Sequence, residues 1–515
     1  MGAQASSADP PPSDNSNRRR LDRTLVSGVT WVAVAKSATQ VISWCSMLVL
    51  ARLLSPTDFA LLGLTTVYLG LINVLSVSGI DSAVIAMPEL RPGIARQLNT
   101  LSILMGLVGS LGAALVAGAA AAFFRTPELT VVISVMGLAF VATGFGIVPR
   151  ALLVREFQFK TLSILDSTQV LIQALSAVVM AWLGMRYWAL VWSGLAGSVW
   201  AGSLLVALRG CGFARPKPGD MKRELTLSWQ VLVARLSWYC YSNADFVVAG
   251  RVLEKNAYGL YSMAWQIAII PVEKITSLIA AVTPPLFSKV QEQPAELRRY
   301  IRALTEGLAL VTFPVGIGLA LVAGPLVRTA FDRRWWGSAG PLTLLCVYAV
   351  IKSIDELMPQ ILKVLRGAGF VMWIQLLALI LFPPSFYYAS RWGGTGIAAV
   401  WLIMYPLFSA PLLWRVCVKT GMRLGEYAQA LKPASAASAV MIALVFAAKY
   451  LIGGSAPSAV ALAIQAAVGA LAYSAVLVLF YRDRLGALAR LVFRRGMAEP
   501  LPAVPGEIEA GPGIA

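Results

Sequence analysis

The chain contains 515 residues, of which 58% are hydrophobic and 13% are charged, with a mean hydropathy of +0.72. This composition excludes a soluble globular protein. The net charge of +18 would suit a nucleic-acid-binding surface, but the sequence shows no soluble basic face with interleaved aromatic residues, so no nucleic-acid partner is expected. There is no histidine, and the five cysteines are scattered, so the sequence predicts neither a catalytic centre nor a cofactor or metal site.

Long apolar runs recur between residues 24 and 481, with short connections. Because lipid offers backbone groups no hydrogen-bond partners, each run is expected to cross the membrane as an α-helix. The sequence therefore predicts an all-α, polytopic membrane protein with about 14 transmembrane helices. The expected spans are 24–51, 58–80, 97–124, 127–149, 161–184, 187–208, 225–250, 257–287, 303–327, 339–362, 369–390, 394–417, 433–453 and 457–481.

The basic residues predict the orientation of these helices. With the N-terminus in the cytoplasm, the cytoplasmic connections and tails contain about 29 of the 43 Lys and Arg, and the outer connections contain about 10. An even number of spans places both termini on the same side. Residues 1–23 are polar and rich in Pro, Ser and Asn, which predicts a disordered cytoplasmic tail rather than a signal peptide.

A short motif occurs twice, 199 positions apart. Residues 52–61, Arg-Leu-Leu-Ser-Pro-Thr-Asp-Phe-Ala-Leu, match residues 251–260, Arg-Val-Leu-Glu-Lys-Asn-Ala-Tyr-Gly-Leu. Each copy forms a corner between two apolar runs, and in the first copy Thr57 or Asp58 is expected to cap the following helix. The match indicates an internal repeat; two unrelated corners of similar composition are the alternative.

The same register aligns Lys36 with Arg235, each a lone cation in an apolar run. Neither has an opposite charge within one turn, and a charge near the bilayer centre costs at least ~2.5–3.5 kcal/mol on insertion scales. Each therefore needs a partner on another helix, a water-filled cavity or a bound anion. Cations at matched depth in two halves favour a transporter for an anionic substrate, whereas a fixed counter-charge such as Asp245 would make their role structural.

Other polar residues in the apolar runs allow both a functional and a structural interpretation. Asp166, Gln169 and Gln173 form one stripe along a helix, which fits an ion site or interhelical hydrogen bonds equally well.

A charged group lies on the eighth and tenth expected helices. Lys352 can neutralise Asp355 or Glu356 on its own helix, or these residues can face a cavity. Either Glu273 or Lys274 can pair with a neighbouring helix, but as adjacent residues they cannot both face one partner.

Residues 51–60, Ala-Arg-Leu-Leu-Ser-Pro-Thr-Asp-Phe-Ala, resemble the AR-L-L-x-P-x-D-F-G signature of Wzx-type polysaccharide-lipid flippases. This family is the polysaccharide transporter branch of the multidrug/oligosaccharidyl-lipid/polysaccharide superfamily. The similarity continues through Pro-Arg-Ala-Leu-Leu at 149–153 and through the second corner, and covers most of residues 24–481. The chain departs from the signature at Ala60, where the family usually has Gly.

The resemblance implies two pseudo-symmetric six-helix bundles that rock around a central cavity by alternating access. It places them at residues 24–208 and 225–418, with a cytoplasmic linker at 209–224, a trailing helix pair at 419–481 and a cytoplasmic tail at 482–515. The implied function is transfer of an undecaprenyl-pyrophosphate-linked oligosaccharide from the cytoplasmic to the periplasmic leaflet of the bacterial inner membrane, for capsule, O-antigen or exopolysaccharide synthesis. Polymerase and export proteins of the same pathway are then expected partners.

The resemblance also implies a substrate site. Family cavities carry basic residues on the first and seventh helices, which Lys36 and Arg235 match, so the pyrophosphate is expected between them. Lys274 or Arg150 would assist its access, the sugars would occupy the hydrated cavity, and the prenyl tail would stay in lipid between helices.

Two acidic residues are candidates for the coupling ion. Asp166 or Asp245 is expected to bind a proton or a sodium ion that drives transport. Trp238 and Trp265 would stack on sugar faces if they line the cavity, although packing is the commoner role of such tryptophans.

Three alternatives remain at this stage. A drug or metabolite exporter of the same superfamily would favour an acidic cavity, and a lipid II flippase differs in substrate rather than in physics. A membrane glycosyl polymerase would need an active site on an outer loop, but the longest outer connection, at 327–338, offers only Asp332 as an acid. The sequence therefore favours a transporter over an enzyme.

Overall fold

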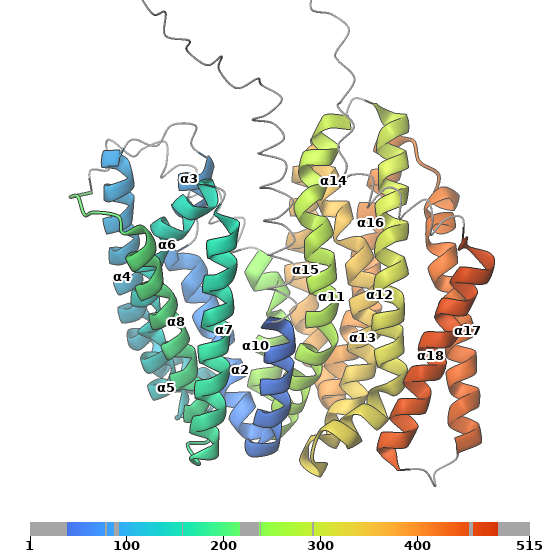
Figure 1. The fold of residues 1–515 in the computed structure, drawn as a ribbon, viewed down its shortest axis with the longest axis horizontal. Helices are drawn as coiled ribbons and strands as arrows, with labels where there is room; N and C mark the ends of the chain where they lie inside the picture. The colour runs from blue at the N-terminus through green and yellow to red at the C-terminus, as the bar shows by residue number, and fades with distance from the viewer. Residues whose placement is uncertain are drawn as a thin grey trace, which may run out of the picture.

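The computed structural model describes residues 39–77, 80–86, 92–156, 158–216, 236, 238–290, 293–452 and 457–482, and every regular element in these ranges is a helix (Figure 1). The first half contains the helix Thr39–Leu53, α2 (Pro56–Val77), α3 (Ile80–Ala86), α4 (Pro92–Phe124), α5 (Leu129–Gly137), α6 (Ala139–Arg155), α7 (Phe159–Trp182) and α8 (Tyr187–Arg209). The second half contains α10 (Ala244–Val252), α11 (Lys255–Val290), α12 (Pro294–Ala330), η1 (Arg333–Ser338), α13 (Ala339–Asp355), α14 (Leu357–Val364), α15 (Ala368–Ala389), η2 (Ser390–Trp392) and α16 (Gly393–Thr420). The helices α17 (Leu424–Ile452) and α18 (Ser458–Phe480) follow.

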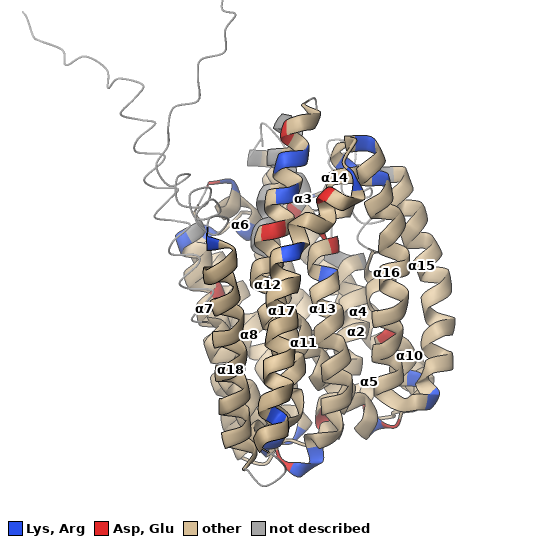
Figure 2. Cartoon of the chain, turned by 90° about the vertical axis from the view of Figure 1, so that its right-hand side faces the viewer, with Lys and Arg blue, Asp and Glu red and all other residues tan. Residues whose placement is uncertain are grey.

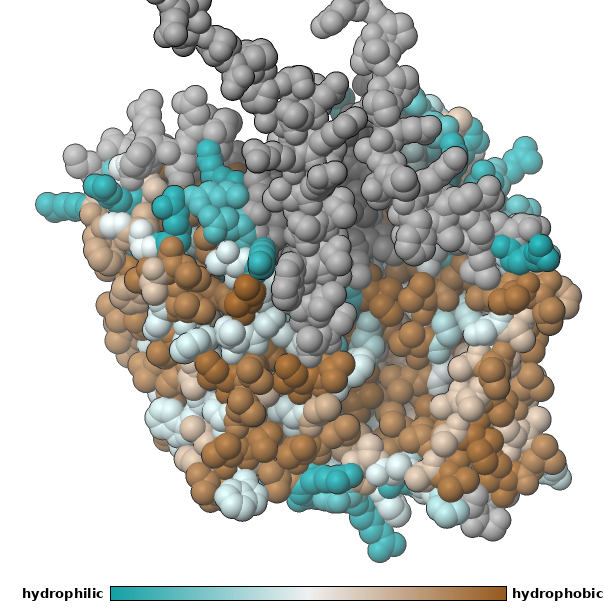
Figure 3. Space-filling view, viewed as in Figure 1, coloured by the Kyte–Doolittle hydropathy of each residue, from teal (hydrophilic) through white to brown (hydrophobic). Residues whose placement is uncertain are grey.

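The surface matches that of a membrane protein. Apolar residues form a broad band around the middle of the face in Figure 3, and most of the charged residues coloured in Figure 2 lie toward the two ends of the helices. Ten helical stretches of the described residues are long and apolar enough to cross a membrane. The prediction of an all-α, polytopic membrane protein is confirmed. The number of 14 spans stays a prediction, because parts of the first and seventh expected helices lie outside the described residues.

Several helices begin earlier than the apolar runs that predicted them. The helix α12 begins at Pro294 rather than at residue 303, and α17 begins at Leu424 rather than at residue 433. Both early turns carry charged residues, among them Arg298 and Glu426. Hydropathy detects only the part of a helix in contact with acyl chains, whereas the helix itself continues into the headgroup region.

The helices form two groups side by side (Figure 1). One group contains α4 to α8 and the other contains α11 to α16, with α2 and α10 between them and α17 and α18 beyond α12. The hydrophobic core continues across both groups, since Leu64, Ile133, Ala264 and Trp401 belong to one cluster of buried residues. Most of the predicted linker, at 217–224, and both predicted tails up to residue 23 and beyond residue 482 lie outside the described residues.

The first corner is capped by a different residue from the one predicted. The backbone N–H and the hydroxyl of Ser55 donate to the Asp58 carboxylate at 3.0 and 2.6 Å, and the Asp58 N–H donates to the Ser55 hydroxyl at 3.3 Å. Ser55 is therefore the N-cap, Pro56 is the first helical residue, and Asp58 completes a reciprocal capping box. The prediction that Thr57 or Asp58 caps the helix was wrong, because the helix begins before both residues, at Pro56.

Candidate functional site

A cavity of about 760 Å³ lies between the two groups of helices. The helix Thr39–Leu53 and the helices α2, α5, α6, α7 and α8 supply its lining from the first half. The second half contributes Tyr239, Asn243 and Phe246 around the start of α10, and Ser262 and Gln266 on α11. We call this cavity the chamber.

The described lining of the chamber combines many polar side chains with apolar ones and contains no charged side chain. Five of its hydroxyls donate to a carbonyl one turn earlier in their own helix: Ser43, Thr66, Thr143, Ser193 and Ser198. Four amide side chains have no hydrogen-bond partner among the described residues: Asn73, Gln169, Gln173 and Gln266. Amides carry both donors and acceptors, so these four provide most of the unused hydrogen-bonding capacity of the chamber.

Local packing explains how two of these amides face the chamber. Gln169 and Gln173 are one turn apart on α7, so their side chains lie on the same helix face. Their stems pack on α8 at Gly197, where an added Cβ would lie 3.4 Å from Cβ of Gln173 and 3.6 Å from Cγ of Gln169. A small residue on α8 therefore lets α7 approach closely and present both amides to the cavity.

The two repeated corners meet at one end of the chamber, which we call the corner end. A Cβ added at Gly259 would lie 2.0 Å from the carbonyl oxygen of Pro56, so the second corner touches the backbone of the first. Further along α2, Gly63 packs against Tyr258 and Gly70 against Tyr239, whose hydroxyl donates to the Val67 carbonyl. Pro56, Gly63 and Gly70 recur every seven residues and so form a single line on α2, here called the α2 seam.

Polar contacts also join the halves at the corner end. The indole N–H of Trp335 on η1 donates to the Ala51 carbonyl at 2.8 Å, and the Arg334 guanidinium donates to the carbonyls of Ala51 and Arg52. A cation and an N–H donor at a helix C-terminus satisfy its unpaired carbonyls and its dipole. Lys255 on α11 pairs with Glu128 of the first half at 3.2 Å. The chamber is therefore closed at this end by contacts between the halves.

A second pocket, of about 540 Å³, shares Asn73 and Thr143 with the chamber and extends away from the corner end. Arg150 and Asp81 line it. The Arg150 guanidinium binds both oxygens of Asp166, at 2.7 and 3.0 Å, with both side chains almost half exposed. The structure thus brings together a predicted substrate residue and a predicted coupling-ion residue, and this ion pair occupies the Asp166 carboxylate.

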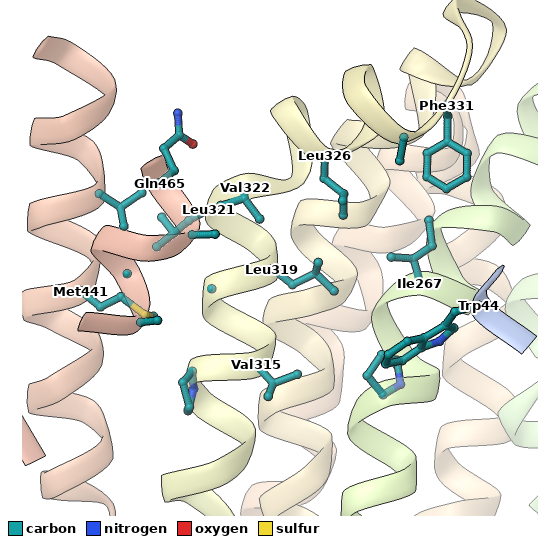
Figure 4. A pocket seen from close by; sticks show the side chains of 18 of the residues that line it. Trp44, Ile267, Val315, Leu319, Leu321, Val322, Leu326, Phe331, Met441 and Gln465 are labelled. Atoms are coloured by element: carbon teal, nitrogen blue, oxygen red, sulfur yellow. The ribbon is translucent and has the colours of Figure 1, made fainter. Parts of the chain in front are cut away.

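An apolar groove of about 610 Å³ lies on the other side of the helix Thr39–Leu53. Figure 4 shows side chains of α12, among them Leu319, between Met441 of α17 on one side and Trp44 and Ile267 on the other. Met47 lines both this groove and the chamber. The apolar groove and the chamber are therefore separated by this helix and by α11, which also contributes residues to both.

Asp245 lies in the core of the second half rather than on the chamber wall. It is fully buried, and its Oδ2 accepts hydrogen bonds from the Tyr261 hydroxyl at 2.6 Å and the Trp401 indole at 3.1 Å. Its Oδ1 has no hydrogen-bond partner among the described residues. One turn along α16, the Tyr405 hydroxyl donates to Asp355 at 3.0 Å. Two buried carboxylates are thus held by aromatic donors of the same helix.

The remaining predicted residues have separate places. Lys352 pairs with Glu273 of α11 at 2.6 Å, so its partner lies on a neighbouring helix and not on its own. Lys274 is exposed on α11 outside the lining of both cavities. Lys36 and Arg235 lie outside the described residues, and whether they meet stays a prediction.

The two predicted tryptophans also differ in their surroundings. Trp265 is packed among aromatic rings, with its centroid 5.3 Å from Phe246 and 5.8 Å from Trp401. Trp238 is 54% exposed and lines the second pocket. Only Trp238 is therefore open to a ligand.

A model of the family described as "Polysaccharide biosynthesis protein" matches residues 49–339, which is more than half of the chain. The chain belongs to this family. This polysaccharide biosynthesis protein is a multi-pass membrane protein, as the sequence predicted.

Its relatives cover most of its length. It is 24% identical to the lipopolysaccharide biosynthesis protein WzxC of Escherichia coli over 78% of this chain and 82% of that protein. It is 23% identical to the teichuronic acid biosynthesis protein TuaB of Bacillus subtilis, over 91% of this chain and 98% of that protein. The succinoglycan biosynthesis transport protein ExoT of Rhizobium meliloti is 23% identical, with 74% and 77% covered.

Solved structures share the fold. The lipid II flippase MurJ in an inward closed conformation matches with a TM-score of 0.71 and 12% identity, over 88% of this chain and 99% of that one. An inward-facing multidrug resistance transporter of the MATE family, in the MOP superfamily, matches with a TM-score of 0.58 and 15% identity, over 74% and 96%. At these identities the likeness concerns the fold, and it agrees with the superfamily that the sequence predicted.

The sequence drew attention to cations, whereas the chamber presents amides. Gln169 and Gln173 were identified as part of a polar stripe, but Asn73 and Gln266 were missed. The available signal was an amide within an apolar stretch of α2 and another within an apolar stretch of α11. Such a residue is costly next to lipid and so tends to face a cavity or another helix.

Proposed function

We propose that this protein moves a lipid-linked oligosaccharide from the cytoplasmic to the periplasmic leaflet of the bacterial inner membrane, with undecaprenyl pyrophosphate as the carrier. The observation that supports this proposal best is a polar chamber that adjoins an apolar groove at Met47. A substrate with a sugar head and a prenyl tail needs both surfaces at once. The predicted excess of cytoplasmic Lys and Arg assigns the corner end to the periplasm.

Each part of the substrate then has a place. The sugars occupy the chamber, the prenyl chain follows the apolar groove beside α17 and α18, and the pyrophosphate is recruited at the second pocket by Arg150. There Arg150 exchanges the Asp166 carboxylate for phosphate oxygens, which a guanidinium binds in the same two-point manner. Lys36 and Arg235 hold the pyrophosphate deeper in the protein. Lys274 lies outside both cavities and is therefore less suited to bind the pyrophosphate.

The contacts at the corner end correspond to one state of the proposed transport cycle. With the halves joined at Gly259 and Trp335, the chamber is closed toward the periplasm. Transport requires the halves to separate there and to approach each other at the opposite end. The line of tyrosine-on-glycine contacts along the α2 seam is the surface that must part.

Asp245 supplies the coupling to an ion gradient. Its Oδ1 lacks a partner in the described protein, so a proton or sodium ion bound there would satisfy a buried oxygen that otherwise costs free energy. Asp166 is less suited to this role because Arg150 already neutralises it. A capsule, O-antigen or exopolysaccharide pathway, with its polymerase and export proteins, would use the product.

Reconstituted vesicles test the proposal. Full-length protein is inserted into liposomes that contain an undecaprenyl-pyrophosphate oligosaccharide with a fluorescent sugar, and an impermeant quencher reports the leaflet in which the sugar lies. Protein-dependent movement of the fluorophore between leaflets is the expected result. Movement no faster than in empty liposomes, with an applied proton or sodium gradient, would contradict the proposal.

A second measurement distinguishes a flippase from an enzyme of the same pathway. A strain that lacks the gene should accumulate the complete lipid-linked repeat unit on the cytoplasmic face. Accumulation of a shorter, unfinished unit, or of a complete unit on the periplasmic face, would indicate a glycosyltransferase or polymerase instead.

A further inference from the structure

The four unpartnered amides of the chamber form a group with a common chemistry. Asn73 comes from α2, Gln169 and Gln173 come from α7, and Gln266 comes from α11 in the other half. None of the four amide groups bonds to another described residue, although each faces a cavity within an otherwise apolar membrane protein. Amide groups placed in such a position and left without protein partners are available to a ligand.

Most of the neighbouring hydroxyls are different because they are already engaged, although those of Ser46 and Ser262 have no hydrogen-bond partner among the described residues. Ser43, Thr143 and Ser193, for example, donate to carbonyls of their own helices and retain only acceptor capacity. Tyr239 donates to the Val67 carbonyl across the seam. The free N–H donors that the described lining offers therefore come mainly from the four amides. A ligand in the chamber must bring hydroxyl or carbonyl groups to meet them.

The described lining of the chamber also contains no charged side chain. The cations assigned to the substrate have another task under the proposed function, since Arg150, which lines the second pocket, serves the pyrophosphate together with Lys36 and Arg235. A sugar carboxylate in the chamber would lose hydration without gaining a cationic partner from these residues, which is unfavourable. A hydroxyl-rich or acetamido sugar would gain hydrogen bonds without this penalty.

We propose that Asn73, Gln169, Gln173 and Gln266 form a sugar-reading site that selects an uncharged oligosaccharide, built from hexoses or N-acetylhexosamines and free of uronic acids. The inference rests on the proposed function and specifies its substrate class. Three of the four amides belong to one half and Gln266 to the other. The site is therefore complete only while the halves are joined at the corner end, and sugar binding favours that state.

Binding measurements on the full chain in lipid nanodiscs test this selection. Three probes are used: undecaprenyl pyrophosphate alone, the same carrier with a neutral tetrasaccharide, and the same tetrasaccharide with one hexose oxidised to its uronic acid. The neutral glycolipid should bind at least about tenfold more tightly than the acidic one. Equal affinities for the two glycolipids would overturn the inference and leave the proposed function standing.

Variants identify the residues responsible. Gln169→Leu, Gln173→Leu and Gln266→Leu should each weaken binding of the neutral glycolipid about tenfold, as expected for the loss of one hydrogen-bonding group. Binding of the carrier alone should not change, which separates a sugar contact from a folding defect. The matched control is Gln429→Leu, an exposed glutamine on α17 outside the chamber. Loss of carrier binding together with glycolipid binding would instead indicate a structural role and contradict the proposal.

A variant that adds a charge to the chamber should shift the binding preference toward the acidic glycolipid. Gln173→Arg places a cation in the chamber and should improve binding of the acidic glycolipid while it weakens the neutral one. No change in this preference would count against a sugar site at Gln173. Failure of the wild-type chain to bind either glycolipid, with carrier binding retained, would contradict the inference, whereas failure with all three probes would contradict the proposed function itself.

Discussion

At the scale of single residues, the charges of Arg150, Lys352 and Asp245 are each either paired or deeply buried. Arg150 is held by both oxygens of Asp166 at the wall of the second pocket, and Lys352 is neutralised by Glu273. Asp245 has two donors on one oxygen and no partner in the described residues on the other. These two arrangements suggest two roles, an exchangeable phosphate contact at Arg150 and a buried ion site at Asp245.

Arg150→Ala should weaken binding of the pyrophosphate carrier. A two-point, charge-assisted contact contributes about 2 kcal/mol, so the apparent affinity should fall by about 30-fold. Titration of nanodisc-embedded protein with undecaprenyl pyrophosphate measures this effect. Arg150→Lys keeps the charge but loses the two-point donor geometry of the guanidinium. Its affinity for the carrier should therefore lie between those of the wild type and Arg150→Ala. Unchanged affinity in Arg150→Ala would show that the Asp166 pair is structural.

Asp245→Asn should uncouple transport from the ion gradient while downhill exchange continues. The substitution keeps the size of the side chain and one acceptor oxygen for Tyr261 and Trp401, but it removes the ionisable group. Gradient-driven movement in vesicles should fall at least about tenfold, to the rate without a gradient. Asp166→Asn serves as the comparison and should alter carrier affinity, not gradient dependence. If Asp166→Asn is the uncoupled variant, the ion site has been assigned to the wrong residue.

At the scale of helices, the contact between the halves depends on small residues in register. The α2 seam places Pro56 against Gly259, Gly63 against Tyr258 and Gly70 against Tyr239. The two helices approach so closely at Gly259 that no side chain fits there, because the nearest atom is the backbone oxygen of Pro56, which cannot rotate away. The repeat therefore carries Gly259 where the first corner carries Ala60, and only the second corner needs the smaller residue.

Gly259→Val should shift the protein away from the state closed at the corner end. Overpacking of this kind costs about 1–3 kcal/mol, which changes the ratio of closed to open molecules by roughly 5- to 150-fold. Spin labels at the exposed corner-end positions 182 and 392 would report a longer average distance. The matched control is Gly118→Val, since an added Cβ at Gly118 meets nothing within 4 Å. An unchanged distance distribution in Gly259→Val would show that the seam does not control closure.

At the scale of the whole molecule, the closed end is held by contacts drawn from distant parts of the sequence. Glu128 lies between α4 and α5, and its partner Lys255 begins α11. The backbone N–H of Glu128 and then Lys255 hold the pKa of this carboxyl below its ordinary value of 4.5. Because the pKa of the Glu128 carboxyl is lowered where it contacts Lys255, its ionised form stabilises the state closed at the corner end at neutral pH. This stabilisation is lost as the pH falls through the lowered pKa.

Acidification should therefore loosen the corner end, and Glu128→Gln should remove this response. Both side chains of the pair are almost half exposed, so its contribution is small, about 0–1 kcal/mol, and the ratio of closed to open molecules should change by no more than about fivefold. The same label pair, measured between neutral and acidic pH, reports the closed fraction. Glu156→Gln is the control, because Glu156 pairs with Arg209 within the first half, away from the corner end. An acid response that persists in Glu128→Gln would place the titrating group elsewhere.

The sequence by itself determined the class of fold and most helix boundaries. Long apolar runs can be satisfied in lipid only by helices, so spans such as 187–208 and 369–390 agree closely with α8 and α15. The corner motif also identified the family, because the turn chemistry of Ser55, Pro56 and Asp58 is local and can be read from neighbouring residues. Local rules act over one or two turns, and they located the corner correctly, although its cap is Ser55 and not Thr57 or Asp58.

The tertiary structure alone decided which residues share a cavity and which charges pair. Lys352 had two carboxylates on its own helix and nevertheless binds Glu273 on another, and Arg150 meets Asp166 across two helices. Asn73 and Gln266 are separated by almost two hundred residues and line one chamber. Which helix faces pack together depends on the shapes of side chains over the whole bundle, and a periodic pattern within one helix contains no information about its neighbour.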